Sequence, residues 1–196
     1  GLNGLVLGYS IIILSVFCFF SYSEHPFIFT FCLSLTACCA SLFLFNFLGK
    51  DIYTGDGGSY FLGFIISILC ITICNENILN ATEIAFLISY PIVEVIFSVL
   101  RRLISQRKRS LEPDNLHLHQ LVFFNVSTLN EKLNLNLTKS ILNSLSSAMI
   151  LIVIMIIILS GLSINHLVNS LFLLALFVMC YLISYYFLLR LYIKNA

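Results

Sequence analysis

Charged side chains are scarce in this chain of 196 residues, since only 10% are Asp, Glu, Lys or Arg while 60% are hydrophobic. A soluble domain is about half apolar and about a quarter charged. The composition, with a mean hydropathy of +1.03, therefore excludes an ordinary soluble protein and predicts an integral membrane protein. The formal net charge is only +1. With no overall basic field, we expect no nucleic-acid partner.

The chain also lacks a cysteine pattern typical of a metal or redox site. No two cysteines have the CxxC spacing together with polar neighbours that a metal or redox site would show. All seven cysteines lie within apolar segments or at their ends. We interpret them as small buried hydrophobic residues rather than as disulfides or metal ligands.

What the chain has in abundance is long apolar runs. A bilayer core is spanned by about 20 apolar residues, and six segments approach that length: 4–20, 27–45, 59–74, 81–100, 140–159 and 166–189. Helices are predicted, because lipid offers no partner for backbone polar groups and the runs lack the alternation of a β-barrel. The predicted fold is an all-α polytopic membrane protein of about six transmembrane helices, the fourth kinked at Pro91.

The basic residues predict how these helices are oriented. With six spans, all ten Lys and Arg residues lie on one side, in loops 46–58 and 101–139 and near the end of the chain. The opposite loops carry none. By the positive-inside rule, both loops and both ends of the chain are expected to be cytoplasmic.

The first polar cluster interrupts the apolar runs at residues 50–64. Asp56 lies between Gly55 and Gly57, just before the third predicted span. A carboxylate there is costly unless it binds something, and it is a hard oxygen ligand of the kind Mg²⁺ takes together with substrate phosphate. The alternative is that Asp56 only caps a helix beginning at Ser59, which is a plausible N-cap. Tyr53 either stacks on a base or anchors the membrane interface.

The second polar cluster is the segment 114–120, which contains His117 and His119. Residues at i and i+2 lie about 200° apart on a helix, so the two rings converge only in an extended or turning segment. They are candidates for phosphate binding or proton handling, or they are two solvated loop histidines. Upstream, Glu94 lies inside the fourth span, either as a functional acid or paired with Arg101 on the same helix face.

In combination and in order, these segments resemble known motifs. Residues 53–59, Tyr-Thr-Gly-Asp-Gly-Gly-Ser, resemble the aromatic-x-Gly-Asp-x-Gly-Ser motif of the polyprenyl-phosphate N-acetylhexosamine-1-phosphate transferases. That family includes the phospho-N-acetylmuramoyl-pentapeptide translocase and the enzymes that initiate O-antigen and teichoic-acid synthesis. Residues 114–119 resemble its Asp-x-x-His-x-His motif, and residues 1–5 resemble the tail of its Asp-Gly-x-Asp/Asn-Gly-Leu motif.

The resemblance implies a reaction and a place for it. An N-acetylhexosamine 1-phosphate would pass from a UDP-sugar, by default UDP-N-acetylglucosamine, to undecaprenyl or another polyprenyl phosphate, with release of UMP. This step would begin a lipid-linked cell-envelope polysaccharide such as O-antigen lipopolysaccharide or a cell-wall polymer. The enzyme would use Mg²⁺, with Mn²⁺ as an alternative, in the bacterial inner membrane, with membrane lipid around it and its site facing the cytoplasm. A homodimer is left open.

The resemblance also implies roles for individual residues. The expected roles are metal ligand for Asp56, catalysis for His117 and His119, and substrate binding for Asn3, Tyr53, Gly55 and Asp114. The family's adjacent aspartate pair is absent from the chain, and Gln120 stands where some members have a further histidine. We therefore expect residues 1–196 to be the C-terminal part of one membrane transferase domain, inactive alone. The competing hypotheses are a transporter-like protein and a non-catalytic membrane scaffold.

Overall fold

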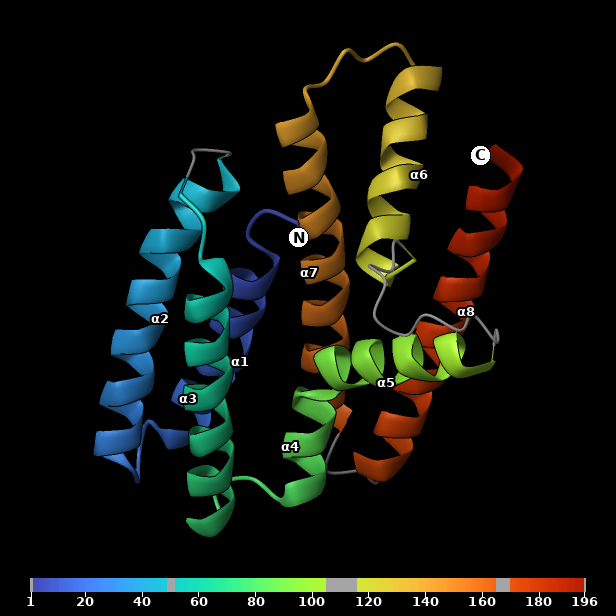
Figure 1. Ribbon diagram of the computed structural model, residues 1–196. Coiled ribbons are helices and arrows are strands. Elements are labelled where there is room, and N and C mark those ends of the chain that lie inside the picture. The colour runs from blue at the N-terminus through green and yellow to red at the C-terminus, as the bar shows by residue number, and fades with distance from the viewer. Residues whose placement is uncertain (1, 49–51, 105–115, 165–169, 196) are drawn as a thin grey trace.

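The computed structural model describes residues 2–48, 52–104, 116–164 and 170–195, and only these are discussed below. The described residues form α-helices and no strand. The helices are α1 (Leu5–Ser21), α2 (Pro26–Phe47), α3 (Gly55–Asn75), α4 (Ala81–Leu87), α5 (Ser89–Ile104), α6 (Leu118–Lys132), α7 (Lys139–Ile164) and α8 (Ser170–Asn195) (Figure 1). The prediction of an all-α polytopic membrane protein is confirmed.

The number of spans is lower than the predicted six. In the described part of the chain, α2, α3, α7 and α8 are long and apolar enough to cross a membrane, and α4 with α5 makes a fifth if that bent pair is one span. The apolar helix α1 has only 17 residues. At about 1.5 Å per residue it is shorter than a hydrocarbon core of about 30 Å.

The predicted fourth span, residues 81–100, is broken rather than merely kinked. The helices α4 and α5 meet at an angle of 69°, so that α5 lies across the long axes of α7 and α8 (Figure 1). The break comes just before Pro91, which lacks the N–H that a continuous helix would direct at the Leu87 carbonyl. Instead, the Tyr9 hydroxyl of α1 donates a hydrogen bond of 2.9 Å to that oxygen.

The prediction of one continuous polar loop over 101–139 was wrong for its second half, which contains α6. The apolar residues Leu118, Leu121 and Val126 of this helix are buried, and α6 packs on both α7 and α8. Because an apolar stripe with helical spacing gains free energy by packing on neighbouring helices, this segment folds back onto the bundle.

Several basic residues of the described chain gather at one end of the bundle. The C-terminal end of α2, the start of α3, the connection from α6 to α7 and the end of α8 all lie there (Figure 1). Lys132 at the end of α6 donates a hydrogen bond of 2.8 Å to Asn195 at the end of α8. This grouping fits the predicted charge asymmetry, and the assignment of that end to the cytoplasm stays a prediction.

Candidate functional site

Four predicted site residues, far apart in the sequence, line one cavity. Asn3 precedes α1, whereas Tyr53, Gly55 and Asp56 lie at the start of α3. The cavity has a volume of about 320 Å³, and its lining consists of these four residues with Leu2, Gly4, Val6, Leu7, Asn46, Thr54 and Ser59. The tertiary structure thus joins the segment preceding α1 to the Gly-Asp segment predicted as a site.

Asn46, near the end of α2, holds the two walls of this cavity together. Its side-chain oxygen accepts a hydrogen bond from the Gly4 N–H. Its side-chain nitrogen donates one of 2.7 Å to the Ile52 carbonyl. Asn46 is buried, so both bonds form in a setting where an unpaired amide is costly. Sequence reasoning missed this residue, because a single asparagine at the end of an apolar run shows no partner.

Three polar residues of α7, Asn143, Ser144 and Ser147, form hydrogen bonds to the chain beside this cavity. The Ser147 hydroxyl donates a hydrogen bond of 2.6 Å to the Asn3 carbonyl, and the Asn143 amide donates one of 3.2 Å to the Asn3 side-chain oxygen. The Ser144 hydroxyl donates to the Phe47 carbonyl. Sequence reasoning also missed these three residues, because they lie within a span recognised only by its mean hydropathy.

Asp56 lies in the first turn of α3, not in a loop before it. The helix begins at Gly55, and the Ser59 hydroxyl donates 2.8 Å back to the Gly55 carbonyl, so the expectation that Ser59 is the N-cap was wrong. Gly55 has φ +64°, and a Cβ added there would meet nothing within 4 Å. The exposed Asp56 carboxylate therefore lies at the positive end of a helix, beside open space.

His117 and His119 converge at the start of α6. His117 precedes the helix with an extended backbone, ψ 151°, and the two rings stack with centroids 5.4 Å apart and an interplanar angle of 16°. The Gln120 side chain accepts a hydrogen bond of 3.0 Å from the His117 backbone N–H. The histidine side chains are 28% and 23% exposed. They are packed residues, not solvated ones.

The carboxylate of Glu94 from α5 lies at the centre of this histidine cluster. Its Oε1 accepts a hydrogen bond of 2.9 Å from the Leu118 N–H and lies 3.1 Å from His117 Nδ1 and 3.8 Å from His119 Nδ1. Its Oε2 accepts a hydrogen bond of 2.8 Å from the Tyr181 hydroxyl of α8. Glu94 is buried, so its charge is compensated by donors from two other helices.

Tyr185, one helical turn after Tyr181, extends the cluster towards Arg101. The Arg101 guanidinium donates a hydrogen bond of 2.8 Å to the Tyr185 hydroxyl, which itself donates 3.1 Å to the Leu116 carbonyl. Sequence reasoning considered Glu94 and Arg101 as a pair on one helix. It missed both tyrosines, which no motif marks.

Burial lowers the pKa of His119 from its ordinary value of 6.5, Glu94 opposes this shift, and the His117 ring reinforces it. Proton uptake by His119 is therefore disfavoured, because burial penalises the charged form of its ring.

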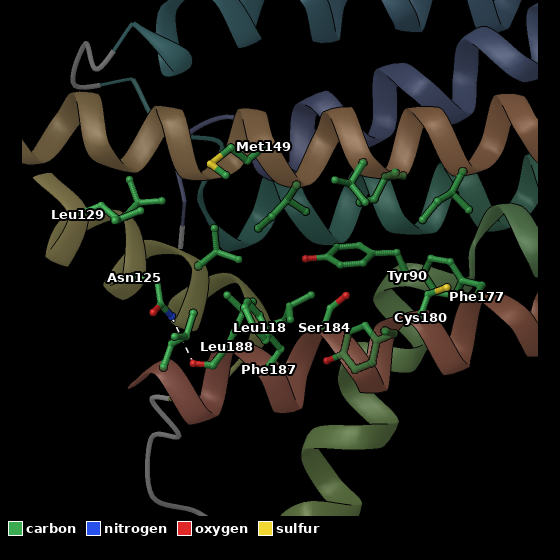
Figure 2. A pocket seen from close by; sticks show the side chains of 18 residues that line it. Tyr90, Leu118, Asn125, Leu129, Met149, Phe177, Cys180, Ser184, Phe187 and Leu188 are labelled. Atoms are coloured by element: carbon green, nitrogen blue, oxygen red, sulfur yellow. Dashed lines mark hydrogen bonds between the residues drawn. The ribbon is translucent and has the colours of Figure 1, made fainter. Parts of the chain in front are cut away.

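A second, apolar cavity adjoins the histidine cluster (Figure 2). It has a volume of about 430 Å³, lies between α6, α7 and α8, and shares Tyr181 and Leu118 with the cluster. Figure 2 shows the Tyr90 ring between α7 and α8 with its hydroxyl oxygen directed into the cavity. That hydroxyl is buried and has no hydrogen-bond partner among the described residues. The cavity is thus open space with one free polar group.

The two polar clusters line different cavities. Neither histidine belongs to the described lining of the Asp56 cavity, and α7 stands between the starts of α3 and α6 in Figure 1. The described residues contain no group of three His, Cys, Asp or Glu side chains arranged to hold a metal ion. Asp114, predicted to bind substrate, lies outside the described residues.

Together, the helices and the polar clusters define a multi-pass helical membrane protein with two cavities near its predicted site residues. Residues 1–74 match the family described as Glycosyl transferase family 4. The chain is also 33% identical over 132 residues to the "Probable undecaprenyl-phosphate N-acetylglucosaminyl 1-phosphate transferase" of Bacillus subtilis (strain 168).

This alignment covers 65% of the chain and 36% of the relative's own length. No solved structure matches the chain. Both sequence matches support the family that the motifs predicted.

Proposed function

We propose that the chain is part of an enzyme that transfers an N-acetylhexosamine 1-phosphate from a UDP-sugar to a polyprenyl phosphate and releases UMP. The observation that carries the proposal is the cavity in which Asn3, Tyr53, Gly55 and Asp56 meet, because these residues come from two separate motifs. The name of the Bacillus subtilis relative includes undecaprenyl phosphate and N-acetylglucosamine, which we take as the polyprenyl phosphate and the sugar of this proposal. The product would begin a lipid-linked envelope polymer on the cytoplasmic side of the inner membrane.

The Asp56 cavity is the proposed donor site. Tyr53 and Asn3 would contact the nucleotide, and Asp56 would hold the metal at the pyrophosphate. Mg²⁺ in proteins commonly has one or two carboxylate ligands, with water and substrate phosphate completing its shell. A single exposed carboxylate beside the open space at Gly55 fits that requirement. When bound there, Mg²⁺ or Mn²⁺ would neutralise the charge that develops during phosphoryl transfer.

The histidine cluster and the apolar cavity form the proposed acceptor site. A polyprenyl phosphate joins an anionic head to a long apolar chain. The cavity between α6, α7 and α8 would take part of the chain, and Tyr181 and Leu118, which also belong to the cluster, would lead to the head. His117 and His119 would contact its phosphate or the diphosphate of the donor.

The proposed chemistry is a phosphoryl substitution. An oxygen of the polyprenyl phosphate attacks the β-phosphorus of the UDP-sugar, the bond from that phosphorus to the bridging oxygen breaks, and UMP leaves with the bridging oxygen. The protein positions the two phosphates and neutralises their charge. Since the chain has no adjacent aspartate pair, we expect it not to release UMP by itself.

The test is UMP release from UDP-N-acetylglucosamine by the intact membrane enzyme in vesicles containing undecaprenyl phosphate. Asp56→Asn keeps the size of the side chain and removes its charge, so we expect at least about a 100-fold loss of rate and an altered dependence on Mg²⁺. Glu131→Gln is the matched control, because Glu131 is an exposed acid of α6 outside both cavities. An Asp56→Asn protein with the rate of the control would show that Asp56 is not the metal ligand, and no UMP release by any of these proteins would favour the scaffold hypothesis.

A further inference from the structure

Glu94 is a buried acid that belongs to no motif assigned above. It comes from α5, whose opposite face presents the exposed residues Ile92, Val95 and Ile96. Because α5 turns by 69° from α4, its polar face meets the start of α6 instead of following the bundle axis. The break in the fourth span thus places the Glu94 carboxylate beside His117 and His119.

The partners of Glu94 determine which of the two ring nitrogens of neutral His117 carries the proton. The Leu118 backbone N–H can only donate, and it donates to Oε1. The Tyr181 hydroxyl donates to Oε2, so both carboxylate oxygens act as acceptors, as they do in an ionised acid. His117 Nδ1, 3.1 Å from Oε1, therefore bears its hydrogen towards Glu94. Its other nitrogen, Nε2, then has a lone pair.

We propose that Glu94 is a positioning residue that holds His117 in the Nδ1-protonated tautomer, so that the Nε2 lone pair can accept the proton of a singly ionised substrate phosphate. A carboxylate that accepts from one imidazole nitrogen sets the tautomer and the orientation of the ring, and it stabilises the imidazolium form. The tautomer follows from the contacts alone. Only its use towards a phosphate rests on the proposed function.

The same geometry limits the charge of the histidine pair. His119 Nδ1 lies 3.8 Å from the oxygen that His117 uses, and the rings are stacked. Among the described residues, the other ionisable groups near Glu94 include Tyr90 and Arg101 from α5 and Tyr181 and Tyr185 from α8, and Arg101 hydrogen-bonds Tyr185. Burial and the adjacent His117 ring both lower the pKa of His119, so His119 is the less readily protonated partner that packs against the His117 ring.

Nitrogen-15 NMR of histidine-labelled protein in lipid nanodiscs tests this inference without an activity assay. We expect neutral His117, assigned by its loss in His117→Gln, to show the Nδ1-protonated tautomer. In Glu94→Ala, the acceptor is gone and the tautomer preference should be lost. Glu131→Gln, which changes an exposed acid of the next helix, should leave the tautomer unchanged.

A wild-type His117 in the Nε2-protonated tautomer would overturn the inference, whether or not the variants fold. An unchanged His117 tautomer in folded Glu94→Ala would overturn it as well. Tyr181→Phe keeps the charge but removes one donor, and it should retain the tautomer.

In transfer assays, Glu94→Gln should lower kcat by about 10- to 100-fold, as loss of an orienting partner does elsewhere, with little change in the KM for the UDP-sugar. If no transfer is seen even with the wild type while the tautomer is as expected, the proposed function fails and the positioning role stands. If the wild type transfers and the His117 tautomer does not respond to Glu94→Ala, the positioning role fails alone.

Discussion

The hydroxyl group of Tyr9 in α1 donates its hydrogen bond to the carbonyl oxygen of Leu87, the acceptor that Pro91 cannot use within a continuous helix. The pair therefore connects α1 to the break between α4 and α5. An unpaired carbonyl inside a membrane protein is costly, because lipid provides no donor. Tyr9 is thus part of the reason why α5 can leave the bundle axis.

Tyr9→Phe should destabilise the protein by about 1–2 kcal/mol, since it removes the donor and leaves the Leu87 carbonyl unsatisfied. The measurement is unfolding of the purified protein in mixed micelles of increasing denaturing detergent. Tyr22→Phe is the control, because Tyr22 is 70% exposed and its hydroxyl should contribute little. Equal stability of the two variants would show that another donor replaces Tyr9.

Gly55 and Gly57 form a matched pair, because an added Cβ would meet nothing within 4 Å at either position. Only Gly55 has a positive φ, +64°. We therefore expect Gly55→Ala to destabilise the start of α3 by about 1 kcal/mol through backbone strain. Gly57→Ala, inside the helix, should be neutral or stabilising by up to about 1 kcal/mol.

The same unfolding assay and UMP release distinguish the two glycines. Loss of activity in Gly55→Ala with full activity in Gly57→Ala would indicate that the left-handed turn shapes the donor cavity. The opposite order would show that contact with substrate, not backbone conformation, selects glycine in this segment.

The pH dependence of stability should report on His119, whose pKa is lowered in the folded protein mainly by burial. Below the ordinary value of 6.5, the unfolded chain binds the proton more readily than the folded one, so folding is progressively destabilised as the pH falls. His119→Gln should lose less stability than the wild type between about pH 7.5 and pH 5.5.

His25→Gln serves as the control for this titration, because His25 lies 3.9 Å from Glu76 at a different place in the fold. Its stability should still fall as the pH drops through the His119 range, because His119 is unchanged in this variant. Identical curves for His119→Gln and the wild type would mean that His119 is not held in its neutral form by the fold.

The apolar cavity can be blocked without touching the histidines. Val153 of α7 lines it, whereas the neighbouring Ile152 does not belong to its lining, and both side chains are more than half exposed. Val153→Trp should raise the KM for polyprenyl phosphate by about tenfold, because a fully used apolar contact contributes about 1–3 kcal/mol. The KM for the UDP-sugar should not change.

Ile152→Trp adds the same bulk about 100° around the helix, outside the described lining of the cavity, and should leave both KM values near those of the wild type. If the two tryptophan variants behave alike, the polyprenyl chain does not lie between α7 and α8. A shortened polyprenyl phosphate should be the least sensitive to Val153→Trp, which gives the location of the chain a second check.

The amino-acid sequence by itself determined the class of the protein and most of its membrane helices. Lipid excludes unpaired backbone groups, so apolar runs such as those of α2, α3, α7 and α8 have to be helical. The motifs indicated Asp56, His117 and His119 as site residues, because polar residues are rare in such apolar runs. The positions of helix ends were less certain, as Ser59 shows.

Only the tertiary structure decided which residues meet. An apolar side chain facing lipid and one facing another helix look alike in sequence, because lipid tails are as apolar as leucine. Hydropathy therefore could not indicate that Asn46 joins Gly4 to Ile52, or that the broken fourth span turns Glu94 towards His117. These contacts depend on hydrogen bonds between distant segments, and partner choice of that kind has no local signature.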